Sequence, residues 1–107
     1  MEDQSLNSLR RLAGVTHAFM VDRTRPPEGE ESAATAQAAL LGAVVAALTQ
    51  AAVDLELGQL GETIIEAERG SVVAGALPNG RAAVVLADSK ANLGMIRMEL
   101  RKLRRQS

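Results

Sequence analysis

The chain has 107 residues, of which 47% are hydrophobic, and a net charge of −1. This length predicts a single domain over residues 1–107 that has a core of its own and is small enough to gain stability from self-association. The absence of cysteine excludes disulfides and thiolate chemistry, and it fits a cytoplasmic protein. The polar first residues show no secretory signal.

The charges divide unevenly along the chain. Residues 26–88 hold nine acids against two bases, and residues 90–107 hold six bases against one acid. The basic segment is interpreted as a solvated helix face that balances an acidic body, or as a surface that steers a partner. Nucleic acid is not expected as that partner, because the segment has no aromatic residue and the sequence pI is near 5.8.

The first elements in chain order are a short helix and a strand. Residues 6–12 place three leucines on one helical face, and Gly14 stands where such a helix would close. Residues Val15–Val21 predict a strand that is apolar on both faces, which is typical of a position inside a sheet. The polar stretch 24–32 has two adjacent prolines and is at best a poor edge strand.

A long alanine-rich helix follows and ends at Gly58. Residues Ser32–Val53 form a run of 22 residues without a charge, ten of them alanine. Because a surface helix normally carries charge on its exposed side, both sides of this one should be covered. The side expected to lie on the sheet comprises Leu41, Val45, Leu48, Ala52 and Leu55, with Leu40 and Val44 beside it.

The other side of this helix carries small residues, which allow a close approach of two helices. They are Ala39, Gly42, Ala43, Ala46 and Gln50. We expect this side to contact a second subunit; the alternative is partly solvated alanine. A membrane span is not expected, although about 20 apolar residues can cross a bilayer. Polar residues dilute the run, acids bound both ends, and no aromatic belt or basic flank is present.

Three strands without an intervening helix come next, and a helix closes the chain. The strands are expected at Glu62–Glu68, Ser71–Leu77 and Arg81–Ala87, and the helix at Asn92–Arg105. The acidic first strand of this meander should lie toward a sheet edge. The strand Arg81–Ala87 is apolar on both faces and should be central, next to Val15–Val21. The order predicts an α+β fold with one antiparallel sheet and helices on its faces.

Four ordered features carry a resemblance to a known family. A leucine-rich helix runs into Gly14-Val15, and an apolar strand closes at Asp22. The alanine-rich helix ends in the glycine-containing turn 57–60, and segment 91–100 has the sequence ANLGMIRMEL. Together these resemble a Roadblock-type domain, the family of dynein light chains and bacterial regulators of Ras-like GTPases, whose last helix begins with an Asn-Leu-Gly motif.

The resemblance implies a profilin-like order α-β-β-α-β-β-β-α with about five strands. The long central helix would cover one face of the sheet, and the N- and C-terminal helices the other. It also implies a homodimer whose sheets join through the third strand, which adds Ile64 and Glu66 to the expected interface. The sequence departs from the family at His17, where a small residue is common, and in the hairpin 24–29, where two prolines stand.

No catalytic constellation is visible in the sequence. It has no phosphate-binding motif of the P-loop type, so it is not itself such a GTPase. The single histidine, His17, is interpreted as structural. Glu62, Glu66 and Glu68 share a strand face that is typical of solvated or arginine-paired glutamates rather than of a metal site. No enzyme activity, cofactor or metal is expected.

The function expected from the resemblance is a non-enzymatic, homodimeric signalling module that binds or regulates a Ras-like small GTPase. The alternative is a structural scaffold with no effect on nucleotide turnover. Contact with the partner is expected near Thr35 and Gln37 of the long helix and near Arg23 and Arg25, in the loop after Asp22 that precedes this helix. An arginine acting in trans on GTP is conceivable but is not required by the resemblance.

Overall fold

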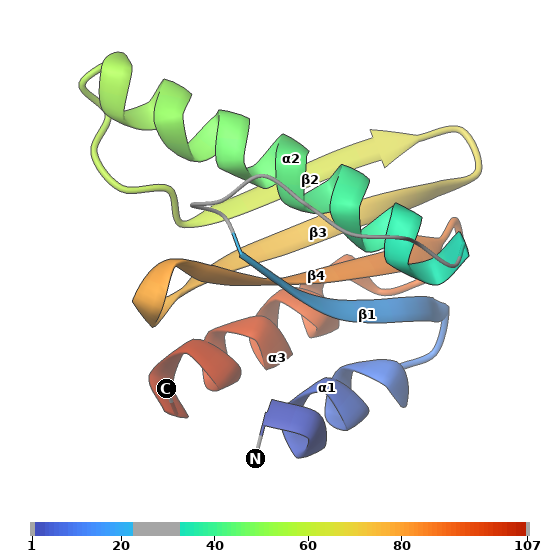
Figure 1. Ribbon diagram of the computed structural model, residues 1–107. Coiled ribbons are helices and arrows are strands. Elements are labelled where there is room, and N and C mark those ends of the chain that lie inside the picture. Colours follow the sequence, from blue (N-terminus) through green and yellow to red (C-terminus); the bar gives the residue numbers. More distant parts are fainter. Residues whose placement is uncertain (1, 23–32, 107) are drawn as a thin grey trace.

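The computed structural model describes residues 2–22 and 33–106. Helices and strands follow one another in the order that the sequence predicts for these residues, and a short 3-10 turn at Pro78–Gly80 joins the last two strands (Figure 1). The elements are α1 Glu2–Arg10, β1 Val15–Asp22, α2 Ala33–Asp54, β2 Glu62–Ala67, β3 Gly70–Leu77, β4 Arg81–Asp88 and α3 Leu93–Gln106.

The described strands form one antiparallel sheet of four strands in the order β1-β4-β3-β2. The predicted meander is confirmed, as is the pairing of β1 with β4, in which Ala18 lies opposite Val85. The acidic strand β2 lies at one edge, as predicted. The strand β1 was expected to be central but lies at the other end of the described sheet. The weak strand expected at 24–32, which would give a fifth strand, lies outside the described residues.

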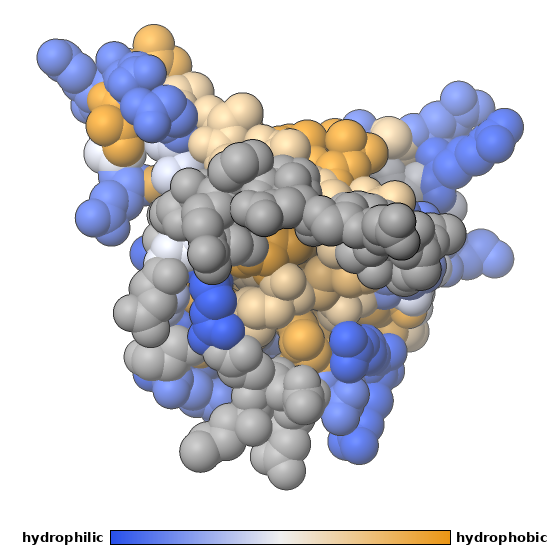
Figure 2. Space-filling view, in the orientation of Figure 1, coloured by the Kyte–Doolittle hydropathy of each residue, from blue (hydrophilic) through white to orange (hydrophobic). Residues whose placement is uncertain are grey.

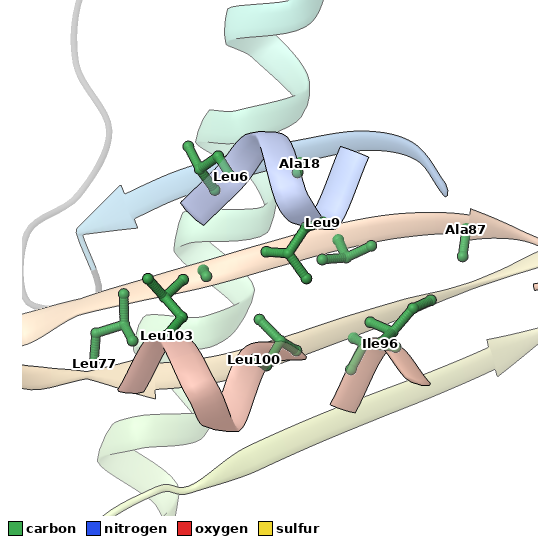
Figure 3. Packing of buried hydrophobic residues seen from close by; sticks show 11 residues of the cluster. Leu6, Leu9, Ala18, Leu77, Ala87, Ile96, Leu100 and Leu103 are labelled. Atoms are coloured by element: carbon green, nitrogen blue, oxygen red, sulfur yellow. The ribbon is translucent and has the colours of Figure 1, made fainter. Parts of the chain in front are cut away.

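Helices cover both faces of the sheet, as the resemblance implies. The helices α1 and α3 pack on one face, and α2 lies across the other (Figure 1). Figure 3 shows Leu9 of α1 and Ile96 and Leu100 of α3 converging on the sheet between the two helices. Burying such leucine and isoleucine side chains contributes roughly 1.5–3 kcal/mol each, so this layer is the main core.

The core under α2 is smaller. Leu41 and Val45 are buried against Val84 of β4 and Ala74 of β3. Leu40 was expected beside this buried stripe but is 66% exposed. It precedes Leu41 by one position, a rotation of about 100° around the helix, which turns its side chain toward solvent.

The end of α2 differs from the sequence prediction. The helix ends at Asp54, and Glu56, not Gly58, takes the left-handed conformation that closes it, with φ of 61°. The amide of Leu57 donates to the carbonyl of Ala52, and the amide of Glu56 to that of Val53. This pair of hydrogen bonds is a Schellman cap. Because the chain turns here, Leu55 does not reach the sheet, as had been expected, but is 68% exposed.

The closing helix α3 begins as its Asn-Leu-Gly motif suggests. The side chain of Asn92 accepts a hydrogen bond from the amide of Met95 at 3.1 Å, which caps the helix. The preceding turn approaches Gly14, where a Cβ atom would lie 2.7 Å from Ala91 and where φ is +85°. Both conditions require glycine at this position. The absence of a side chain at Gly14 lets the start of β1 pack closely against the turn before α3.

Candidate protein interaction surface

One side of α2 has no covering layer among the described residues. In the most apolar part of Ala36–Asp54, only 17% of the helix is buried inside the subunit. Figure 2 shows orange and pale-orange atoms in the upper part of the view, where Figure 1 places this helix. The exposed side, which we call the outer face of α2, comprises Ala36, Leu40, Ala43, Ala47 and Gln50.

By length and composition, Ala36–Asp54 is the one described helix that could cross a bilayer. Its other side, however, packs through Leu41 and Val45 on the sheet, where Ala82 and Val84 are fully buried. Removing α2 into lipid would expose this core. The apolar outer face therefore belongs to a helix that is part of the folded subunit, which favours a protein contact over a membrane span.

The edge strand β2 forms a second incompletely covered surface. Ile64 and Ile65 are 40% and 42% exposed, one on each face of the strand. Within the described sheet β2 pairs with β3 alone, so its outer edge presents unpaired amide and carbonyl groups. Such an edge is a ready template for pairing with another strand. Leu60, in the loop from α2 to β2, packs partly buried against the cluster under α2, so one packed loop connects the two surfaces.

The residues predicted for a dimer interface differ in exposure. Gly42 is already buried within the subunit, and Ala39 and Ala46 are half-buried. The amide of Gln50 donates to the carboxylate of Asp54 at 2.8 Å. The predicted residues on the surface of the described subunit are Ala43, Gln50, Ile64 and Glu66.

The residues predicted for partner binding are less completely placed. Gln37 is exposed near the start of α2, and Thr35 lies in its first turns. Arg23 and Arg25 lie outside the described residues. The sequence prediction did not include Leu40 and Ala47, which continue the outer face of α2. Spacing of three and four residues from Ala43 is the signal that places both of them on its side of a helix.

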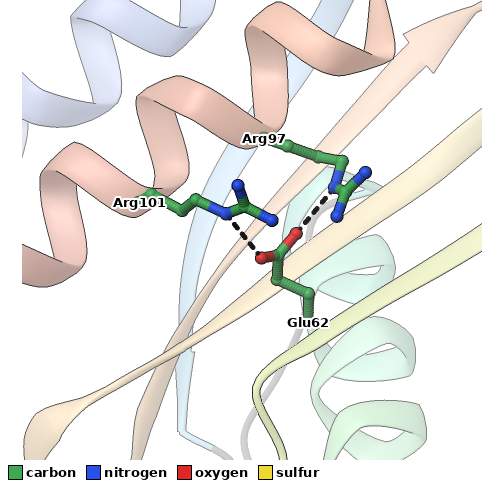
Figure 4. A network of polar contacts seen from close by, with 3 residues as sticks. All are labelled: Glu62, Arg97 and Arg101. Carbon is green, nitrogen blue, oxygen red and sulfur yellow. Dashed lines mark hydrogen bonds and ion pairs between the residues drawn. The ribbon is translucent and has the colours of Figure 1, made fainter.

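An ion-pair network fixes the start of β2 to α3. The Nε atoms of Arg97 and Arg101 donate to the two carboxylate oxygens of Glu62 at 2.8 and 2.9 Å (Figure 4). The hydrogen bond from Arg97, with further help from Arg101, holds the pKa of the Glu62 carboxyl below its usual value, although partial burial opposes this shift. The expectation that this strand face pairs with arginine is confirmed at Glu62.

The described side chains offer no arrangement that suggests catalysis. His17 is exposed on β1, with its ring stacked on Phe19 at 5.8 Å and its Nδ1 atom 3.2 Å from the hydroxyl of Thr16. Over residues 2–22 and 33–106, no three His, Cys, Asp or Glu side chains gather closely enough to hold a metal ion. The candidate site is therefore a surface, formed by the outer face of α2 and the edge of β2.

Comparison with known proteins finds similarity in structure. No family model and no curated protein sequence matches the chain. A solved Roadblock/LC7 domain from Streptomyces avermitilis is 18% identical with a TM-score of 0.79, over 97% of this chain and 92% of that one. MglB from Myxococcus xanthus is 20% identical with a TM-score of 0.76, over 92% and 85%. The gliding protein MglB from Thermus thermophilus is 18% identical with a TM-score of 0.72, over 98% and 89%.

These identities are low, but the superpositions cover nearly the whole of each chain. The solved neighbours match the resemblance that the leucine-rich helix, the glycine-closed turns and the Asn-Leu-Gly motif carry in the sequence. The chain thus has the fold of the Roadblock/LC7 domains.

Proposed function

We propose that this chain is a non-enzymatic, homodimeric module that binds and regulates a Ras-like small GTPase in the cytoplasm. The observation that carries the proposal is an uncharged outer face of α2 beside an unpaired edge strand among the described residues. A soluble protein rarely leaves such surfaces uncovered. The likeness to Roadblock/LC7 and MglB structures supports a regulatory role over a catalytic one.

A symmetric contact would cover both surfaces. Antiparallel pairing of β2 with β2 of a second copy extends the sheet across a two-fold axis perpendicular to it. Both α2 helices then lie on the same face of the joined sheet. The small side chains at Ala39, Ala43 and Ala46 would let these helices approach closely. Ile64 and Glu66 would lie at the joint.

The GTPase would bind on the α2 side of this dimer. The exposed start of α2, with Gln37, lies on the same side as the outer face, and the region with Arg23 and Arg25 precedes it in the chain. A single asymmetric partner that crosses the two-fold axis blocks a second copy, so we expect one GTPase for each dimer.

A structural scaffold is the second candidate, because the same surfaces can join proteins without changing nucleotide turnover. The test is to mix the purified chain with a small GTPase encoded beside it and to measure both complex formation and GTP hydrolysis. A regulator binds and changes the hydrolysis rate, whereas a scaffold binds without changing it. No binding in either nucleotide state would contradict both candidates for that pair. The chain alone should show no turnover, since it has no P-loop.

A further inference from the structure

The closing helix α3 presents a second surface, on the opposite side of the sheet from α2. Ile96, Leu100 and Leu103 point into the core. Helical periodicity places Met98 and Arg105 opposite these buried residues. Met95 and Met98 are 50% and 55% exposed although both are apolar. We call the exposed side, with Met95, Met98, Arg101, Lys102 and Arg105, the outer face of α3.

This face has an excess of positive charge. Five of the charged residues of α3 are basic, and Glu99 is its one acid. Arg97 and Arg101 share Glu62, and Lys102 pairs with Glu99 at 3.3 Å. The structure gives the side chains of Arg104 and Arg105 no hydrogen bond or ion pair with any of the described residues.

The neighbouring helix also ends in basic residues. Arg10 and Arg11 are exposed at the end of α1, which packs in the same layer as α3. Arg10, however, donates hydrogen bonds to the side chain of Asn7 and to the carbonyl of Ala18 on β1. The excess of positive charge is therefore that of α3.

We propose that the outer face of α3 binds an anionic membrane surface. Arginine and lysine near a bilayer are attracted to acidic headgroups. Methionine side chains are apolar and flexible, and they can enter the boundary between headgroups and acyl chains, as the apolar residues of interfacial helices do. Arginine side chains without an ion-pair partner would contact the negative headgroups, and the exposed methionines would contact the apolar acyl chains beneath them.

Other anionic partners match this face less completely. A nucleic acid offers phosphate charge, but single strands are held by stacking on aromatic residues, and α3 has none. Duplex phosphates leave the two methionines without an apolar counterpart. An acidic protein is the remaining alternative. If the face bound only such a protein, the chain would not bind anionic lipid vesicles.

A dimer would strengthen the contact; this step rests on the proposed homodimer. With β2 paired to β2 across an axis perpendicular to the sheet, both α3 helices lie on one face of the joined sheet and both α2 helices on the other. Two basic faces then meet the same bilayer, which raises avidity without a new contact. The α2 side stays open to a GTPase.

The test uses the full chain and sedimentation with lipid vesicles. We expect binding to phosphatidylcholine vesicles that contain about 30% phosphatidylglycerol, none to pure phosphatidylcholine, and a strong decrease at about 0.5 M NaCl. Each base near the bilayer strengthens binding roughly fivefold. The double variant Lys102→Gln/Arg105→Gln, which removes two bases of the outer face of α3, should therefore bind about 25-fold more weakly. Absence of binding to the anionic vesicles at low salt would overturn the proposal.

Two matched variants locate the contact. Arg105→Gln should weaken binding, whereas Arg69→Gln, the same charge change at the exposed turn between β2 and β3, should not; equal effects would overturn the proposal. Met95→Ser/Met98→Ser should weaken binding to vesicles while leaving any retention on heparin, a lipid-free polyanion, unchanged. Unchanged vesicle binding by this variant would show a contact by charge alone and would contradict the role given to the methionines.

Failure of this proposal is separable from failure of the proposed function. If sedimentation shows a monomer that still binds anionic vesicles through α3, the membrane contact stands and the homodimer is wrong. If a dimer forms and binds a GTPase but ignores anionic vesicles, the membrane contact is wrong and the proposed function stands.

Discussion

Glu56 holds a backbone conformation that other residue types adopt more easily. With φ of 61° it occupies the left-handed region, and its amide helps to cap α2. For a residue with a Cβ atom this conformation costs roughly 1–2 kcal/mol, and glycine avoids the cost while losing more entropy on folding. Glycine at position 56 is therefore expected to give a more stable fold than the native glutamate.

Glu56→Gly should stabilise the fold by about 0.5–1 kcal/mol. The reason is relief of the left-handed strain, which exceeds the added entropy of the unfolded chain. Glu56→Ala keeps a Cβ atom and should change stability little. Urea unfolding at fixed protein concentration measures both. A loss of stability in the glycine variant would show that the carboxylate contributes something beyond the cap.

Glu62 carries a charge that links two elements of the described fold. Its carboxylate receives one hydrogen bond from Arg97 and one from Arg101, which link the edge strand β2 to α3. Its pKa in the folded protein lies below the ordinary value of 4.5. The network therefore stabilises the fold fully above about pH 4.5 and loses its effect as the pH falls through the lowered pKa.

Glu62→Gln should cost about 1 kcal/mol of unfolding free energy at pH 7, the upper range for partly exposed ion pairs. The difference from the native chain should shrink as the pH falls through the lowered pKa of Glu62, because the native carboxylate is then also uncharged. Glu68→Gln, at an exposed position just past β2, is the control and should have little effect. A loss that stays equal as the pH is lowered from 7 through the acid range, measured by urea unfolding, would contradict an electrostatic origin.

Among the elements, α2 shows how far sequence patterns extend. The uncharged, alanine-rich run Ser32–Val53 predicted a helix whose exposed side needs to be covered by another surface. The structure confirms the helix. Leu41 and Val45 were placed correctly on the sheet, whereas Leu40 and Leu55 were not. The rotation of a helix on its sheet and the place where it ends depend on tertiary packing and on cap geometry, and neither is encoded by hydrophobicity alone.

A charge on the outer face of α2 should weaken the proposed dimer. Ala43→Glu would bury an unpaired carboxylate between subunits, a cost of several kcal/mol. Ala13→Glu makes the same change at an exposed turn after α1 and serves as the control. Sedimentation equilibrium should show a dimer for the native chain and the control, and dissociation for Ala43→Glu. A monomer for the native chain at about 50 μM would contradict the interface, since an obligate contact of this kind is expected to persist at such concentrations.

For the whole molecule, the sequence predicted most strand neighbours because each strand has its own apolar pattern and the turns are marked by glycine and proline. The division of the helices between the two faces of the sheet followed from the family resemblance. It did not predict the partners of Glu62, which are 35 and 39 residues away. It also did not predict that the basic helix would expose Met95 and Met98. Such features depend on which elements the fold brings together, and residue spacing along the chain does not encode that.

The central claim is that two copies of this chain form one surface for one GTPase. Sedimentation velocity of the chain with a fluorescently labelled, GTP-loaded small GTPase tests it most directly. The account predicts a complex of two chains with one GTPase, lost in Ala43→Glu and retained in Ala13→Glu. A complex of one chain with one GTPase, unaffected by Ala43→Glu, would contradict it.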